Sequence, residues 1–498
     1  MAIPKEILSV ERPVNSVVYA YGKNKDRYAV KERIGCKYSN GRRIPINGNT
    51  IGHIINGKYV EINRLEPVKV SLTKTDLKDW GNVVLCDTVF KSILIELKKI
   101  YCEEDALKIY CIAIIRVCNP GIKDYELKEA YDTSFLSELY PNVALSKNTV
   151  STFFCNLGKS CSKIRNFMQN RAATVKIDHH LLIDGTLKTN NSKVNSLSDF
   201  SRKSKIKGSK DISVLFAFDL EIMEPICSKC FPGNMLDSTA YEEFISENKI
   251  TKGIVVADKG FPSSAAATQF FSNPDLHYLN PIKRNSKLIS TYNLHNYTGI
   301  LVGYDNVTFK KTKCVGKEKW IYSYRDAKRA AIEEQDWLKR TGVKNNYSFE
   351  NLQKKQKVFG TVILESDIDI PPEIAYKAYE SRWEIEIVMR FYKSACDFDE
   401  TRVQNDYSVI AAEFCDFLAT ILTYRLINKF DSKQLLNKMT FKKIIKILER
   451  AKKVKNDNEE WQLIKMNPSQ IEVLQKLELL PNVEQEKKRP GRPKKNSV

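Results

Sequence analysis

The chain has 498 residues, which is too long for a single hydrophobic core, so several domains are expected. Eighty Lys and Arg residues outnumber 60 Asp and Glu residues, which gives a formal net charge of +20. This excess favours a polyanionic partner, and nucleic acid is the usual one. A basic enzyme with no role on nucleic acid stays open on charge alone.

Membrane insertion and secretion are disfavoured. The first residues, MAIPKEILSV, lack a basic segment followed by an apolar one, so no signal peptide is expected. The longest apolar stretch, Ala411–Ile427, is interrupted by Glu413, Asp416 and Arg425 and is predicted to be a buried helix. Twelve cysteines, mostly isolated, suit a reducing cytosol. Only Cys227 and Cys230 have zinc-ligand spacing, and no second pair completes a site.

The first third of the chain changes from strand to helix. Residues 16–62 have β-branched and aromatic content between Asn/Gly turns, which predicts strands. From about residue 86 to 169, apolar residues recur every three or four positions, which predicts helices. Ser146 is a candidate N-cap for a helix that presents Asn148, Thr149 and Ser151. That helix resembles the reading helix of a helix-turn-helix, and an ordinary amphipathic helix is an equal alternative.

The central region alternates strands with helices, which indicates a mixed α/β sheet. Strands are predicted at HHLLIDG, ISVLFAFDL, GIVVADKGF and VFGTVILESD, with helices at 238–247 and 371–393. A Lys- and Tyr-rich insertion over about 285–357 contains strand-like VTFKKTKCV and KWIYSYRD and then a polar helix. The chain is predicted to be helical from residue 396 to about residue 480.

Two aspartates occupy the same kind of position. Asp184 follows the apolar run LLI and precedes Gly185, which is expected to turn the chain, and Asp258 follows IVVA with Gly260 two residues on. Charges at the end of buried strands need a cation or hydrogen bonds to compensate their burial. Turn or capping roles are the alternative, and the pair favours a metal site.

Helix geometry selects the third carboxylate. At about 100° per residue, Tyr379, Arg382, Glu386 and Lys393 lie within a stripe about 60° wide. Glu384 and Glu380 lie outside this stripe, so Glu386 is the carboxylate that shares a face with two cations and a phenol. Three carboxylates suit two Mg²⁺ ions, with Mn²⁺ as a substitute, for phosphoryl transfer. Arg382 and Lys393 are candidates for holding phosphates.

These residues carry a family signature. Tyr379, Arg382, Glu386 and Lys393, separated by two, three and six residues, match the Y-(2)-R-(3)-E-(6)-K motif. Over about residues 177–430 the chain resembles the "IS-four" superfamily of bacterial insertion-sequence transposases. LIDGT resembles the first catalytic block of that superfamily, VVADKGF the second and SRWEIE the core of the third. The resemblance implies an RNase H-like DDE fold with a β-rich insertion between the second and third acids.

The resemblance also implies the chemistry. Asp184, Asp258 and Glu386 would be the catalytic metal ligands, while Tyr379, Arg382 and Lys393 would contact the DNA end. Relatives cut through a hairpin intermediate and stack an aromatic residue of the insertion on a flipped base. Trp320 is the candidate here, against the alternative of a core Trp in a β-hairpin. Relatives act as dimers that pair two DNA ends.

The C-terminal tail has the pattern of an AT-hook. Residues 487–495 read KKRPGRPKK, and Arg489 and Arg492 in an extended Pro-rich backbone can enter an A·T-rich minor groove. A solvated basic run is the alternative.

The sequence therefore predicts a cytoplasmic, nucleoid-associated bacterial DNA transposase that cuts transposon ends and joins them to target DNA. An RNase H-like nuclease without strand transfer and an inactive DNA-binding remnant are the alternatives. The expected regions run from the N-terminus as follows: a β-rich region (1–85), a helical region for DNA-end binding (86–176), the first part of the catalytic core (177–284), the β-rich insertion (285–357), the second part of the core (358–430), a helical region (431–483) and the tail (484–498).

Overall fold

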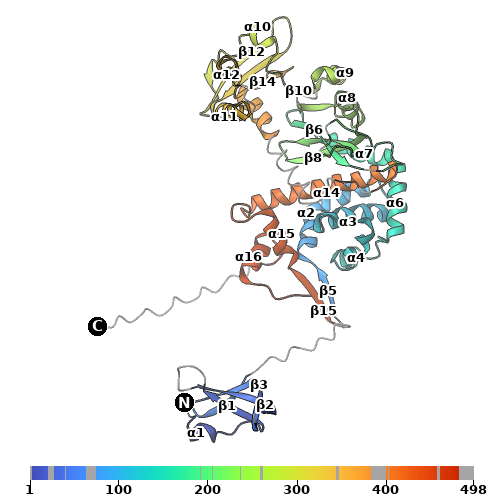
Figure 1. The fold of residues 1–498 in the computed structure, drawn as a ribbon. Coiled ribbons are helices and arrows are strands. Elements are labelled where there is room, and N and C mark those ends of the chain that lie inside the picture. The colour runs from blue at the N-terminus through green and yellow to red at the C-terminus, as the bar shows by residue number, and fades with distance from the viewer. Residues whose placement is uncertain are drawn as a thin grey trace. The chain divides into compact units, whose positions relative to one another are not determined.

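The computed structural model describes most of the chain (Figure 1). The described residues are 3–20, 27–39, 41–62, 75–190, 192–202, 204, 206–235, 237–257, 262–343, 347–382, 400–401, 403–456 and 460–481. The chain divides into two compact units. One comprises Met1–Asp76 and Asn456–Glu459, and the other comprises Leu77–Lys455 and Glu460–Val498.

The N-terminal unit contains an antiparallel sheet in the order β1-β2-β3-β4. Its strands are β1 (Ser16–Ala20), β2 (Arg27–Ser39), β3 (Arg42–Ile55) and β4 (Lys58–Glu61), and a short helix, α1 (Lys5–Leu8), precedes them. Asn56 and Gly57 join β3 to β4 with φ of 50° and 70°, as a two-residue hairpin turn requires. Val18, Val30 and Ile54 form the small core. The strands predicted over residues 16–62 are confirmed.

The larger unit contains a nine-stranded sheet in the described part of the chain, ordered β11-β12-β13-β14-β10-β9-β6-β7-β8. Its strands are β6 (His180–Thr189), β7 (Asp211–Asp219), β8 (Glu224–Pro232), β9 (Lys252–Ala257), β10 (Asp275–Pro281), β11 (Gly299–Ile300), β12 (Val307–Lys313), β13 (Trp320–Asp326) and β14 (Thr361–Ser366). In the five-strand segment β8-β7-β6-β9-β10, β9 runs parallel to both β6 and β10, and the other pairs are antiparallel. This mixed sheet fits the RNase H-like core that the sequence predicts.

Helices cover the sheet, and one of them is almost entirely enclosed. In Figure 1, α14 (Asp406–Ser432) runs between the sheet and the helices α2 (Gly81–Lys98) and α3 (Glu103–Cys118). A helix that is apolar on all sides belongs inside a protein, and the prediction of a buried helix at 411–427 is confirmed. No helix within the described ranges combines the length and apolarity that a bilayer span requires.

The remaining elements pack around these layers. In the first half of the unit they are β5 (Thr75–Asp79), η2 (Asp124–Glu126), α4 (Leu127–Asp132), α5 (Leu136–Leu139), α6 (Lys147–Lys159), α7 (Cys161–Ala172), α8 (Asp237–Glu247), η3 (Ser263–Ala266) and α9 (Ala267–Ser272). Later in the chain they are α10 (Leu288–Thr291), α11 (Ala327–Val343), α12 (Phe349–Gln356), a helix over 372–382, α15 (Phe441–Glu449), β15 (Lys452–Asn456), β16 (Gln462–Leu463) and α16 (Pro468–Lys476). A small sheet is ordered β16-β15-β5, so the prediction of helix throughout residues 431–483 is wrong at β15 and β16, where pairing with distant β5 adds strands.

One carboxylate ties together the segment between β10 and β14. Glu333 on α11 accepts two hydrogen bonds of 2.8 Å from Arg284, one of 3.0 Å from Arg329 and one of 3.0 Å from the Gly360 N–H. Burial opposes ionisation, but these donors hold the pKa of Glu333 at about 2, below its ordinary value of 4.5. Glu333 thus joins α11 to both ends of the segment.

We expect Glu333→Gln to lower the urea midpoint of the full chain at pH 7. A depressed folded-state pKa gives stability that is present above the unfolded pKa of 4.5 and is lost as the pH falls toward 2. The difference from the wild type should therefore shrink below about pH 4.5. Glu350→Gln, at an exposed position on α12, is the control. A difference that is independent of pH would contradict this account.

Candidate active site

Asp184 lies in the middle of β6 and is half-buried. The expected turn at Gly185 is wrong, because β6 continues to Thr189 and Gly185 pairs with Leu215 of β7. The antiparallel ladder with β7 supplies hydrogen-bond partners beyond the glycine, so the strand does not end there. The Gly185 N–H donates a hydrogen bond of 2.8 Å to the Asp184 Oδ1 atom.

The parallel neighbour β9 ends beside this aspartate. Its last residue, Ala257, pairs with Ile183, the residue before Asp184. Both strands are buried up to this point, since Leu181, Leu182, Ile183 and Val256 are fully enclosed. Asp258, the residue after Ala257, lies outside the described residues. The described backbone therefore brings the end of β9 to the position of the first predicted acid.

The helix over 372–382 precedes the third predicted acid in the sequence. Tyr379 and Arg382 share one face, as the helical arithmetic predicts, with the Arg382 guanidinium 5.4 Å from the Tyr379 ring centroid. Both side chains are buried, and Tyr379 is part of an apolar cluster with Tyr322 and Tyr376. This part of the face is enclosed by protein, whereas the sequence suggests that it faces a polar ligand. Glu386 and Lys393 lie outside the described residues.

A buried ion network anchors β6 below Asp184. Lys188 Nζ lies 2.6 Å from Glu413 Oε2 and 2.7 Å from Asp416 Oδ2, both on α14. Asp416 also pairs with Arg116 of α3 at 2.6 Å. Burial opposes the charge on Lys188, but the two carboxylates raise its pKa. Lys188 is four residues after Asp184 and on the same side of the strand, so the network fixes the strand that carries the acid.

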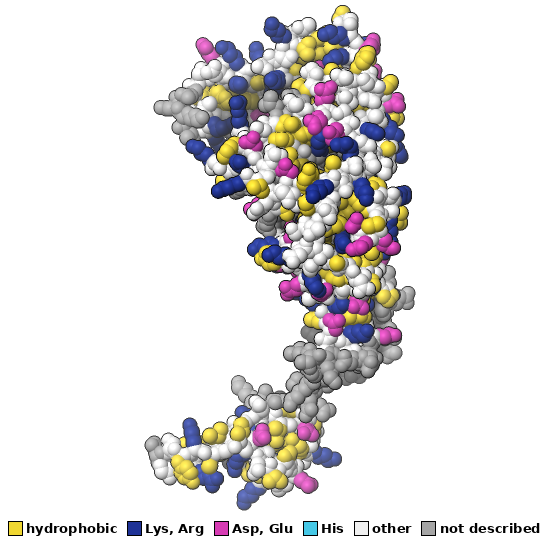
Figure 2. Space-filling model, turned by 90° about the vertical axis from the view of Figure 1, so that its right-hand side faces the viewer, with side chains coloured by type: hydrophobic (Ala, Val, Ile, Leu, Met, Phe, Trp, Pro, Cys, Tyr) yellow, Lys and Arg dark blue, Asp and Glu magenta, His cyan; other side chains and the backbone are white. Residues whose placement is uncertain are grey.

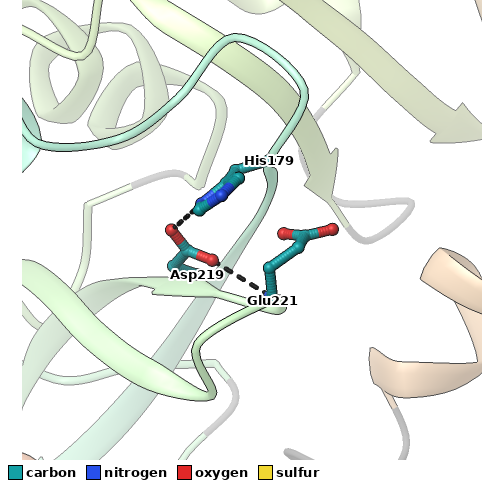
Figure 3. Close-up of side chains that lie close together, drawn as sticks. All are labelled: His179, Asp219 and Glu221. Atoms are coloured by element: carbon teal, nitrogen blue, oxygen red, sulfur yellow. Dashed lines mark hydrogen bonds and ion pairs between the residues drawn. The ribbon is translucent and has the colours of Figure 1, made fainter.

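A second cluster lies at the N-terminal end of the same strand (Figure 3). The closest ligand atoms of His179, Asp219 and Glu221 lie within 4.8 Å of one another. His179 Nδ1 lies 2.6 Å from Asp219 Oδ2, and the Glu221 N–H donates to Asp219 Oδ1 at 3.0 Å. Burial raises the pKa of Asp219. His179 precedes Asp184 by five residues, about 16 Å along a strand, so this cluster is distinct from the predicted triad.

The hydrogen bonds account for this cluster without a cation. Glu221 Oε1 lies 2.7 Å from His180 Nδ1, and its Oε2 accepts the His180 N–H at 2.7 Å. Burial opposes ionisation, but these bonds lower the pKa of Glu221. The two His–carboxylate pairs connect the turn between β7 and β8 to the start of β6. The sequence interpretation missed them, although the His179-His180 pair before the strand was visible.

Trp320 starts β13 and is half-buried against the apolar cluster that includes Tyr379. The amines of Lys311 and Lys313 lie 5.1 and 5.4 Å from its ring centroid. One part of the indole therefore packs against the apolar cluster, and two lysine amines lie near the ring. Base stacking by Trp320 stays a prediction.

A basic pocket opens elsewhere on the same segment. Its volume is about 880 Å³. It is lined by His295, Tyr297, Arg325, Glu350, Gln353, Lys354, Gln356 and Lys357. Burial and the nearby Lys357 lower the pKa of His295. Three cations against one carboxylate make this pocket suited to an anion.

The other predicted features differ in how far the structure describes them. Ser146 caps α6 by accepting from the Thr149 N–H, as predicted, and Asn148 and Ser151 are exposed. Cys227 and Cys230 lie three residues apart in β8, which directs their side chains to opposite faces and away from a shared zinc. Arg489 and Arg492 lie outside the described residues.

Comparison with known proteins gives a family match in the central region. Residues 176–411, just under half of the chain, match the family model "Transposase DDE domain". This match spans the positions of Asp184, Asp258 and Glu386. It supports a DDE transposase, and with it a general function in DNA transposition.

Two solved structures are similar at low identity. A piggyBac transposase synaptic complex with hairpin DNA is 12% identical, with a TM-score of 0.36 over 74% of this chain and 80% of that chain. A Mos1 transposase paired-end complex with the left transposon end is 13% identical, with a TM-score of 0.15 over 32% of this chain and 58% of that chain. No curated protein matches significantly.

We expect Lys188→Met to destabilise the full chain by about 3–5 kcal/mol, because it leaves Glu413 and Asp416 buried beside one cation fewer. Urea unfolding measures this change. Lys193→Met, at an exposed position, should have little effect. The double variant Lys188→Met/Glu413→Leu should recover part of the loss. Equal midpoints for Lys188→Met and the wild type would contradict a stabilising network.

Proposed function

We propose that the chain is a cut-and-paste DNA transposase whose active site is built from Asp184, Asp258 and Glu386. The observation that carries this proposal is the pairing of Ile183 with Ala257, which brings the end of β9 beside Asp184 within the region that matches the transposase DDE domain. Residues that follow paired positions on adjacent parallel strands lie side by side, about one strand spacing apart.

The donor set suits hard divalent cations. Asp184 is half-buried at the point where its parallel neighbour ends, so its carboxylate sits on a rigid strand and is still reachable from solvent. Asp184, Asp258 and Glu386 would hold two Mg²⁺ ions, with Mn²⁺ as a substitute. Bound there, the ions would supply Lewis-acid polarisation of the phosphate and a more acidic attacking hydroxyl.

The chain's own residues would orient the DNA. Arg382 is held against Tyr379 at the start of the segment that contains Glu386 and Lys393, so the buried pair fixes where this segment begins. Lys393 would contact phosphate, and Trp320 would stack on a base near the cut if a hairpin is formed. The cations of the pocket around Arg325 would also attract the phosphate backbone of the DNA. Pairing of two ends by a homodimer follows from the family resemblance.

We expect Mg²⁺-dependent cleavage of a duplex carrying the element's own ends to disappear in Asp184→Ala, Asp258→Ala and Glu386→Ala, with duplex binding kept. Two matched controls are Asp178→Ala, exposed just before β6, and Glu384→Ala. Glu221→Ala tests the second cluster. Normal cutting by Asp184→Ala together with loss in Glu221→Ala would contradict the proposal and place the active site at the N-terminal end of β6.

Strand transfer separates the transposase from its alternatives. Pre-cut ends incubated with a target plasmid and Mg²⁺ should be joined to the plasmid by the wild type. Cleavage without joining would indicate a nuclease, and binding without cleavage would indicate an inactive remnant.

We further predict that deletion of residues 486–498 weakens binding to A·T-rich duplex more than to G·C-rich duplex. Arg489 and Arg492 would enter the narrow minor groove of the former. Fluorescence anisotropy measures both affinities. Equal losses would indicate a nonspecific basic tail.

A further inference from the structure

The hairpin of β2 and β3 extends beyond the rest of its sheet. β1 pairs with β2 only from Tyr28 to Glu32, and β4 pairs with β3 only from Gly52 to Ile55. Further out, Gly35–Ser39 pairs with Arg42–Ile46 and with no third strand among the described residues. We call residues 34–39 and 41–46 the arm.

The arm is exposed on both faces. Every residue of it is exposed, and Ile34 and Tyr38 are 68% and 75% exposed. A two-stranded hairpin is at best marginally stable in water. Exposed apolar side chains on such a ribbon indicate a surface that is covered by a partner.

The positive charge of the arm indicates which kind of partner would cover it. No Asp or Glu occurs from Arg33 to Val60, a stretch that contains Lys37, Arg42 and Arg43. Figure 2 shows basic and apolar side chains together on the projection of the N-terminal unit. Lys37 lies opposite Ile44, and Arg43 lies opposite Tyr38, so cations occupy both faces of the ribbon. Two copies of this arm would repel each other, whereas a polyanion would be attracted.

We propose that the arm inserts as a two-stranded β-ribbon into the major groove of duplex DNA. The strands of a sheet lie about 4.8 Å apart. A major groove about 12 Å wide admits such a ribbon. The face that carries Tyr38 and Arg43 turns toward the base edges, and the long side chains of Lys37 and Arg42 on the other face reach the phosphates along the groove. The choice of DNA as the polyanion rests on the proposed function, and it adds a DNA-reading surface outside the catalytic unit.

The test compares salt dependence in full-length chains. The triple variant Lys37→Gln/Arg42→Gln/Arg43→Gln is measured against the wild type and against Lys5→Gln/Lys58→Gln, two exposed lysines of the same unit outside the arm. Binding to a duplex carrying an element end is followed by fluorescence anisotropy between about 50 and 300 mM NaCl. Over such a range the release of counterions from the DNA changes the affinity measurably. Each lost phosphate contact should reduce the slope of log K against log salt by about 0.9. We expect the triple variant to lose about two such contacts and the control to keep its slope.

A second measurement identifies the groove. Dimethyl sulfate modifies guanine N7, which lies in the major groove, so the wild type should protect guanines that the triple variant leaves reactive. An unchanged slope with unchanged protection would overturn the proposal and leave the catalytic assignment standing. A variant that binds DNA normally but changes its oligomeric state in gel filtration would instead assign the arm to a protein contact. Asp184→Ala should bind like the wild type, so loss of catalysis and loss of the arm are distinguishable.

Discussion

The parallel pairing of β6 with β9 is the constraint on which the candidate site depends. The ladder joins His180 through Ile183 to Ile254 through Ala257. Both strands are buried, and a slip of one residue would turn every side chain to the opposite face. The register therefore determines that Asp184 stands where β9 ends. The antiparallel ladder to β7 holds the other edge of β6 along its whole length, which keeps the aspartate inside a rigid strand.

The helical layer holds β6 in place and also holds residues 400–401, where the described chain resumes after 383–399. Lys188 binds β6 to α14, and α14 is bound in turn to α3 through Arg116. Thr401 donates its N–H to the Thr189 carbonyl and its hydroxyl to Glu413. On the other side, Tyr379 is buried in the apolar cluster under β13 and β14. The residues that flank 383–399 are thus anchored at both ends to the sheet that carries Asp184.

Segments with a strong local pattern of apolar residues could be predicted from the sequence. Segments whose structure depends on contacts with distant residues could not. Apolar β-branched runs identified β6, β7, β9 and β14. β8 and β10 were missed, because Glu224–Pro232 and Asp275–Pro281 mix Pro, Cys, His and Asn into strands whose pairing comes from neighbours distant in sequence. Gly185 was expected to form a turn, but the ladder with β7 overrides that local preference. Helical arithmetic placed Tyr379 beside Arg382, whereas their burial depends on tertiary packing. The partners of Lys188 lie more than 200 residues away, beyond the reach of local patterns.

The most direct test of the central claim is anomalous X-ray scattering from Mn²⁺ in crystals of the full chain bound to a DNA end. Asp184 is the described member of the predicted ligand set, and the end of β9 lies next to it. Our account predicts Mn²⁺ density bound by the Asp184 carboxylate beside the end of β9. Density confined to His179, Asp219 and Glu221, with none at Asp184, would contradict it.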